Sequence, residues 1–109
     1  MTKPNVNVTV GAPSNIKSTS QLNYVLVKAK VDFIAQINAP DTIYQIRWDF
    51  DLKGRTLNVP AGCRFDFIGG QLSNGTIHWN NTRVINIYDY TILNNIQEQG
   101  TRITTFGQI

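Results

Sequence analysis

Cysteine and histidine are almost absent from this sequence of 109 residues, since Cys63 and His78 are the only ones. A single cysteine forms no disulfide within its own chain and supplies too few thiolates for a usual zinc site. We therefore expect Cys63 to be a small buried residue. No serine or carboxylate stands at a sequence spacing from His78 that would indicate a catalytic triad. The sequence predicts no enzyme activity, no metal site and no cofactor.

Long apolar runs are also missing. None approaches the roughly 20 residues of a membrane span, and the N-terminus lacks the apolar segment of a secretory signal. Charged residues make up only 16% of the chain, and the basic residues behind its net charge of +3 form no run. Scattered charge of this size is typical of a solvated surface. We therefore expect synthesis in the cytoplasm, with neither a membrane nor a nucleic-acid partner.

The residue types that are plentiful favour β-structure. Hydrophobic residues make up 41% of the chain, which excludes full disorder, and twelve asparagines supply uncharged polarity. Asparagine suits turns and can hydrogen-bond a neighbouring subunit without burying charge. A chain of this length forms one domain and buries only about 60–65% of its unfolded surface, so a monomer would be marginally stable.

Alternation is clearest between Tyr44 and Leu52, where every second residue is apolar and the residues between are polar. This period-two pattern predicts a single strand with one face in the core, and it places Trp48 on that face. Asp49 and Asp51 share the other face. Paired carboxylates occur in glycoside hydrolysis and cation binding, but a solvated, ion-paired strand face also explains them, and we favour that interpretation.

Short apolar stretches continue after this strand, separated by corners such as Lys53-Gly54, Gly69-Gly70 and Asn74-Gly75. Sandwiches, barrels and parallel β-helices all show such a pattern. Because the stretches are very short and the corners are single turns, we favour a short right-handed β-helix or β-solenoid, or a β-prism subunit. The predicted fold class is all-β, with residues 40–93 as the core.

An N-terminal arm is predicted within residues 1–39, which we expect to hold one or more strands for docking or oligomerisation. Val6, Val8 and Val10 alternate with polar residues, which is typical of a strand. An isolated strand is not stable alone, so we expect another chain to pair with it.

Residues 20–37 allow two interpretations. Apolar residues alternate from Tyr24 to Phe33, which predicts a strand, and the β-branched content favours this interpretation. A helix with Ser20 as its N-cap and an end at Ile37 also fits the spacing of the apolar residues. Both interpretations stay open at this point.

A C-terminal arm is predicted over residues 94–109, which are mostly polar. The tail from Gln97 to Ile109 allows two interpretations, a final strand or an arm that docks on a neighbour. Ile103 and Phe106 are its main apolar points, and we expect them to contact a neighbouring subunit.

A set of spaced motifs lies between residues 40 and 87. Its members are Thr42–Leu52, Gly54, Val59-Pro60, Cys63, Phe67, Gly69-Gly70, Leu72, Asn74–Ile77 and Asn81-Thr82. This stretch resembles a recurring segment in virion and surface proteins of phages and prophages of gut Bacteroidales, crAss-like phages among them. In that family the segment begins a right-handed pectate-lyase-like β-helix. Family members usually continue into many further turns with receptor-binding or glycan-cleaving sites, whereas about twenty residues follow Ile87 here. The resemblance therefore implies an architecture and a virion setting, and no activity.

The expected function is a structural protein of a bacteriophage virion, assembled in the cytoplasm of the bacterial host. A solenoid of two or three turns leaves unpaired strand edges and an incompletely covered core, and three chains around one axis would cover both. We expect a homotrimeric fibre or capsid-decoration subunit, with a head fibre slightly preferred over a tail fibre. The expected partners are further copies of the chain and other virion proteins such as capsid or tail proteins.

A carbohydrate-binding module for host-surface glycans is the alternative function. Trp79, Tyr88 and Tyr90 are its candidate contact residues, because aromatic rings offer both apolar faces and polar edges. A fragment of a glycan depolymerase is a weaker alternative, since few acidic residues follow Asp51.

Overall fold

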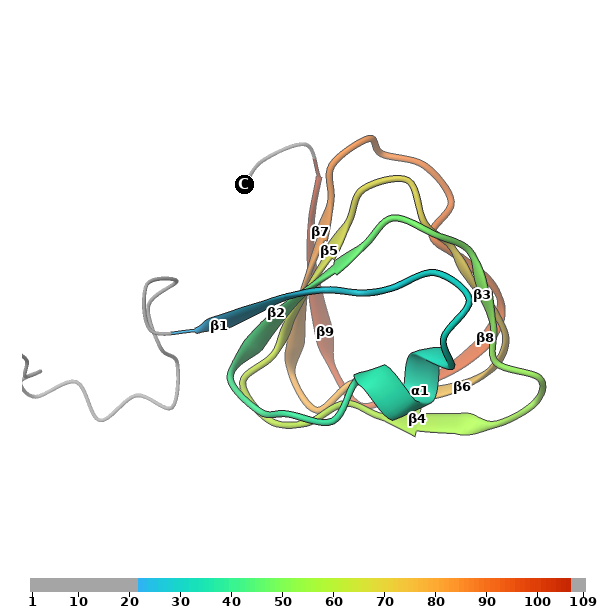
Figure 1. The fold of residues 1–109 in the computed structure, drawn as a ribbon, viewed down its shortest axis with the longest axis horizontal. Helices are drawn as coiled ribbons and strands as arrows, with labels where there is room; N and C mark the ends of the chain where they lie inside the picture. Colours follow the sequence, from blue (N-terminus) through green and yellow to red (C-terminus); the bar gives the residue numbers. More distant parts are fainter. Residues whose placement is uncertain (1–21, 107–109) are drawn as a thin grey trace, which may run out of the picture.

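The computed structural model describes residues 22–106, which form a β-solenoid of about four turns (Figure 1). The strands are β1 (Asn23–Leu26), β2 (Thr42–Ile46), β3 (Phe50–Asp51), β4 (Thr56–Asn58), β5 (Arg64–Phe67), β6 (Leu72–His78), β7 (Thr82–Asn86), β8 (Leu93–Gln99) and β9 (Arg102–Phe106). One short helix, α1 (Phe33–Gln36), follows β1. The prediction of an all-β, β-solenoid-like fold is confirmed.

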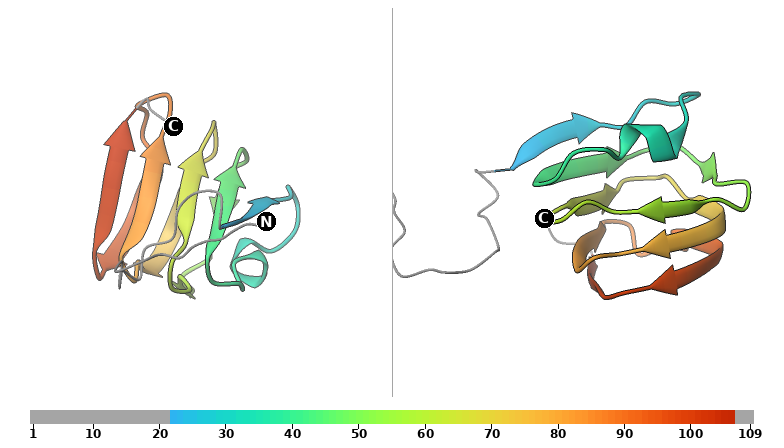
Figure 2. Two further views of the ribbon diagram at one scale, coloured as in Figure 1. Left: turned by 90° about the vertical axis from the view of Figure 1, so that its left-hand side faces the viewer. Right: turned by 90° about the horizontal axis from the view of Figure 1, so that it is seen from below.

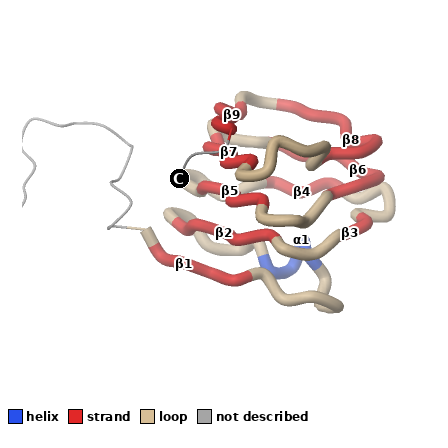
Figure 3. Tube along the Cα trace, turned by 90° about the horizontal axis from the view of Figure 1, so that it is seen from above, coloured by secondary structure: helices blue, strands red, loops and turns tan. Residues whose placement is uncertain are grey.

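Two parallel sheets make up the walls of the solenoid. Sheet A has the strand order β1-β2-β5-β7-β9, and its strands lie side by side and point the same way (Figure 2). Sheet B has the order β3-β6-β4, and β8 also pairs with β6. Parallel neighbours need a long connection between them. From β2 onward each connection passes through the other sheet, whereas the connection from β1 to β2 passes through α1. The turns consequently stack one on the next (Figure 3).

Side chains of one kind stack at equivalent positions of successive turns. In sheet A, Tyr44 pairs with Phe65 and Phe65 pairs with Val84, so a turn takes 21 residues from 44 to 65 and 19 from 65 to 84. All three side chains belong to one buried core. The Phe65 ring lies at its centre, with centroid distances of 5.9 Å to Tyr44 and 5.7 Å to Trp79. This stacking of large apolar groups holds the turns together.

Helix α1 closes the N-terminal end of the solenoid. The Asp32 carboxylate caps it by accepting a hydrogen bond from the Ala35 backbone N–H at 3.1 Å. The first helical residue, Phe33, is buried, with ring-centroid distances of 4.9 Å to Phe50 and 6.1 Å to Phe65. Figure 1 shows α1 lying over this end, so the helix covers the core there.

The long strand predicted from Tyr44 to Leu52 is wrong. Strand β2 ends at Ile46, the chain turns a corner, and β3 begins at Phe50. Trp48 lies in that corner and is 52% exposed, although the alternation places it in the core. The reason is the size of the solenoid: each wall takes only a few residues before the chain must turn.

Both interpretations of residues 20–37 are incomplete. Strand β1 ends at Leu26, well before the predicted end at Phe33, and the helix begins only at Phe33, with Asp32 in place of Ser20 as its cap. Ser20 itself lies outside the described residues.

The predicted arms have different outcomes. Residues 94–99 and 102–106, predicted to belong to a C-terminal arm, lie in β8 and β9, and these strands pair with β6 and β7 as the last turn of the solenoid. For the tail from Gln97 this agrees with the final-strand interpretation. Long-range pairing overrides the polar composition of this stretch. Val6, Val8 and Val10 lie outside the described residues.

Candidate functional site

Among residues 22–106 no helix lies over the C-terminal end of the solenoid, in contrast to the end that α1 covers, and we call it the open end. Within residues 22–106, β8 pairs only with β6 and β9 pairs only with β7, so one edge of each strand has no neighbour. A hollow of about 280 Å³ lies inside the last turn. It is lined by Asn86, Tyr90, Ile92, Leu93, Glu98, Arg102 and Thr104. A partner that pairs with these edges would meet this hollow as well.

A charged pair covers the indole of Trp79 in this last turn. Glu98 Oε1 accepts a hydrogen bond from Trp79 Nε1 at 2.7 Å and lies 2.5 Å from Arg102 Nε. The Arg102 guanidinium also lies 5.8 Å from the centre of the indole ring. Its hydrogen bond to Glu98 is the main cause that lowers the pKa of that carboxyl, although partial burial opposes it. Glu98 therefore stays ionised at neutral pH, and the lining of the last turn is charged where earlier turns are apolar.

Only one of the three predicted glycan-contact residues is freely exposed. The prediction for Trp79 is wrong, because its side chain is fully buried at the end of β6, where the inward positions of that strand continue. Tyr90 is half-buried, and its hydroxyl accepts a hydrogen bond from the Gly69 N–H at 2.9 Å and donates one to the Gly70 carbonyl. Tyr88 is 64% exposed.

The predicted C-terminal interface residues both lie in β9, the last strand of sheet A. Ile103 is exposed and pairs in register with Arg83, and Phe106 pairs in register with Asn86. Both thus belong to the open end of the solenoid. Whether they contact another subunit stays a prediction.

The acidic residues are not brought together. Asp49 lies in the corner before β3, whereas Asp51 lies in β3 and its carboxylate accepts a hydrogen bond from the Lys53 N–H at 2.8 Å. Asp66 is buried and paired with Arg64 through two contacts of 2.8 and 2.9 Å. Within residues 22–106 no group of three or more His, Cys, Asp or Glu side chains is placed to hold a metal ion.

His78 and Cys63 have ordinary structural surroundings. His78 is exposed on β6 and pairs in register with Asn58 and Gln99. Cys63 is buried, as predicted, and its thiol donates a hydrogen bond to the Ala39 carbonyl at 3.3 Å. Burial raises the pKa of this thiol, so it stays protonated and unreactive at neutral pH.

Sequence reasoning missed Trp48 as a surface residue. It joins Tyr88 among the exposed aromatic side chains, and both lie in connections that lead from sheet A to sheet B. A signal was available: Arg47-Trp48-Asp49 stands where the chain turns, about 20 residues before Ile68-Gly69-Gly70, an evident corner.

Comparison with known proteins finds no match to the chain among protein families, curated proteins or solved structures. The likeness to phage proteins thus rests on the residues between 40 and 87 alone. Among the described residues, no helix is long and apolar enough to cross a membrane.

Proposed function

We propose that this chain is a structural subunit of a bacteriophage particle and that it assembles with copies of itself into a fibre or a capsid decoration. The difference between the two ends of the solenoid carries the proposal. One end is covered by α1 and Phe33, although the outer edge of β1 also lacks a neighbour among the described residues. The other end presents the outer edges of β8 and β9 and a hollow of about 280 Å³, and among the described residues no helix lies over it.

Unpaired edges are binding surfaces for another chain, because their N–H and C=O groups lack partners. The hollow also favours binding of another chain, since the atoms around it lack van der Waals contacts on one side. A neighbouring subunit that pairs with the outer edges of β8 and β9 would supply the missing hydrogen bonds and would contact the rim of the hollow, while Glu98 and Arg102 inside it stay open to water. Assembly therefore gives a small domain the stability that its own short solenoid does not supply.

The charged pair at the open end favours a closed oligomer over an endless stack. Inward-pointing charges on an edge discourage the unlimited addition of strands. Glu98 and Arg102 lie inside the last turn, where a second solenoid stacked directly on it would bury them. A fixed number of copies around one axis, three in the present proposal, leaves this pair in contact with water.

The phage setting is supported by the resemblance of residues 40–87 to virion proteins of Bacteroidales phages. A head fibre is slightly preferred over a tail fibre, and the docking partner would be another virion protein such as a capsid or tail protein.

Substitution of Ile103 by aspartate is expected to break the oligomer. Ile103 is 56% exposed on β9, at the open end, so a carboxylate there would be buried against a neighbouring subunit, and Arg83 in register on β7 would offset only part of that cost. Val31→Asp is the matched control, because Val31 is 45% exposed but lies beside the capped end. Native mass spectrometry and light scattering should give three copies for the wild type and for Val31→Asp, and one copy for Ile103→Asp. A monodisperse wild-type monomer with a cooperative thermal transition would contradict the proposal.

A further inference from the structure

The outer face of sheet A is buried at its centre, although no described strand or helix lies over it (Figure 2). Side chains of a strand alternate between its two faces, so the neighbours of Tyr44, Phe65 and Val84 in the chain point away from the core. Two of these outward residues are Ile43 and Ile85, which are only 2% and 6% exposed and do not belong to the buried core. They are buried within a single copy of the chain, so the group that covers them belongs to that copy.

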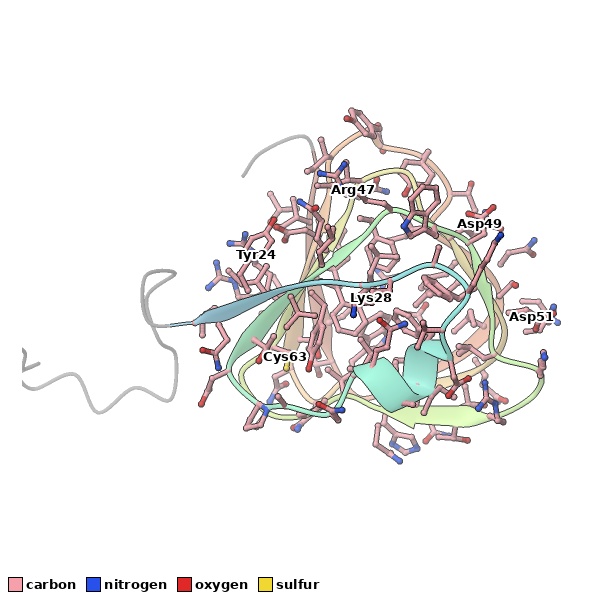
Figure 4. The ribbon with its side chains drawn as sticks, viewed as in Figure 1. Tyr24, Lys28, Arg47, Asp49, Asp51 and Cys63 are labelled. Carbon is pink, nitrogen blue, oxygen red and sulfur yellow. The ribbon has the colours of Figure 1, made fainter. Side chains whose placement is uncertain are left out.

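Polar side chains on the same face are buried as well. Arg64 donates hydrogen bonds to both carboxylate oxygens of Asp66, at 2.8 and 2.9 Å, and the two side chains are only 8% and 3% exposed. Gln45 Nε2 donates to the Tyr24 hydroxyl at 2.6 Å, and Figure 4 shows Tyr24 on the outer side of sheet A. A charged pair loses hydration when it is buried, and polar partners have to replace the lost water. The face is therefore suited to a cover that brings hydrogen-bonding groups of its own.

Sheet B shows an outer face of the same solenoid without a cover. Exposed Thr56 and Asn58 stand on either side of buried Leu57 in β4, and exposed His78 follows buried Ile77 in β6. In sheet A, by contrast, every residue of β2 and β5 is buried. Parallel strands that are buried on both faces have a layer of structure against each face. We infer a second layer on sheet A.

The segment that precedes the described residues is long enough to form this layer. It enters the solenoid at β1, the edge strand of sheet A. The 12 residues from Val10 to Gln21 span up to about 40 Å when extended, whereas the five strands of sheet A, roughly 4.8 Å apart, span about 19 Å. The three residues after Phe106 span only about 10 Å from β9, which is too short to reach Ile43 on β2, about 14 Å away across three strand spacings.

The residue types of this segment also fit the face. Val6, Val8 and Val10 alternate with polar residues, so one side of the segment is apolar and matches the two outward isoleucines. A guanidinium has five N–H groups, and the backbone carbonyls and asparagine side chains of the segment are acceptors for those of Arg64 that do not face Asp66. Residues 1–21 contain two lysines and no acidic residue, so they bring no carboxylate close to Asp66.

We propose that residues 1–21 fold back over the outer face of sheet A in their own chain. Their three alternating valines pack against Ile43 and Ile85, and the segment shields the Arg64–Asp66 pair from water. This arrangement differs from the predicted pairing of the N-terminal arm with another chain. It does not depend on assembly of the chain into a particle.

A nitroxide label on Thr9→Cys in the full chain tests the proposal by NMR. Thr9 lies between two of the valines, so the label points away from the face, and the buried Cys63 leaves the new cysteine as the reactive thiol. Backbone amides of β2, β5 and β7 are expected to broaden more strongly than those of β4 and β6. A mixture of unlabelled ¹⁵N chains with nitroxide-labelled ¹⁴N chains should lose this preference for sheet A, because each segment covers its own chain.

Ile85→Asp is expected to abolish the preference for sheet A. Ile85 pairs in register with Asp66, so the new carboxylate removes an apolar contact and adds a like charge beside a buried one. Val31→Asp is the matched control, because Val31 is 45% exposed beside the capped end, and it should keep the preference. Circular dichroism and thermal melts establish that each variant is folded, and the wild-type comparison of the two sheets decides alone if Ile85→Asp does not fold.

Equal broadening of the two sheets would overturn the proposal, and so would an unchanged preference for sheet A in folded Ile85→Asp. Broadening of sheet A in the mixed sample alone would mean that the segment covers a second copy of the chain, which also contradicts the proposal.

Discussion

Trp79→Ala is expected to lower the free energy of unfolding by about 3–5 kcal/mol. The indole is fully buried, its ring centre lies 5.7 Å from that of Phe65, and its N–H donates to Glu98. The substitution leaves a cavity next to the central ring of the core and removes a hydrogen-bond donor from a partly buried carboxylate. Since small domains have only about 5–15 kcal/mol of stability, guanidinium denaturation should show the loss clearly.

Trp48→Ala is the matched control, and it should lower the free energy of unfolding by at most about 1 kcal/mol, because Trp48 is half exposed at a corner. Trp79→Phe keeps a ring in the core, so its loss of unfolding free energy should lie between those of Trp48→Ala and Trp79→Ala. This variant can still be measured if Trp79→Ala does not fold. A larger loss of unfolding free energy for Trp48→Ala than for Trp79→Ala would mean that Trp48, and not Trp79, lies in the core.

Gly70→Ala is expected to lower the free energy of unfolding by about 3 kcal/mol or more, mainly through overpacking. A Cβ atom there would lie 2.4 Å from the carbonyl oxygen of Trp48, 2.9 Å from its backbone nitrogen and 2.7 Å from Ile46 Cγ2. Two of these atoms belong to the backbone of the neighbouring turn, so the turns must separate to admit a methyl group. The loss should appear as a lower denaturation midpoint in the same titration.

Gly54→Ala separates this clash from the general effect of losing a glycine. Gly54 has φ +78°, and no atom lies within 4 Å of the position that a Cβ would take there. Only the left-handed backbone penalty of about 1–2 kcal/mol therefore applies. Equal losses at the two positions would mean that the neighbouring turns do not approach each other at Gly70.

The fold class was predictable because short strands and glycine-rich corners are local features of the sequence. The positions of the corners were not, because period-two alternation runs from Tyr44 to Leu52 through a corner as smoothly as through a strand. The structure follows a second, longer period of about 20 residues, which sets where each wall ends. This longer period explains why Trp48 is exposed and Trp79 is buried, which is the reverse of the prediction.

The last turn carries a signal of that longer period. Asn74 and Asn95 stand 21 residues apart, both have φ +58°, and their side chains share a hydrogen bond of 2.9 Å. Equivalent asparagines in successive turns mark β8 as a continuation of the solenoid, although its composition is that of an arm. Local sequence patterns do not predict that Asn74 and Asn95 are partners, because the two residues lie a whole turn of the solenoid apart.

The candidate sites show the same limit. The exposed position of Tyr88 was predictable because it follows a strand and lies beside a turn, whereas its role as a contact residue stays a prediction. The exposed position of Trp48 was not predictable, since it depends on strand β2 ending at Ile46. The open end likewise depends on which strands lack a neighbour, and this is a property of the whole sheet.

The central claim is that the chain is a structural component of a phage particle, and quantitative mass spectrometry of purified particles tests it most directly. If the claim is right, particles of a phage whose genome carries this chain should contain it in a fixed ratio to the capsid protein, in a multiple of three copies, and gold-labelled antibodies should locate it on the head. A chain that is abundant in the infected-cell lysate but missing from washed particles would contradict the claim.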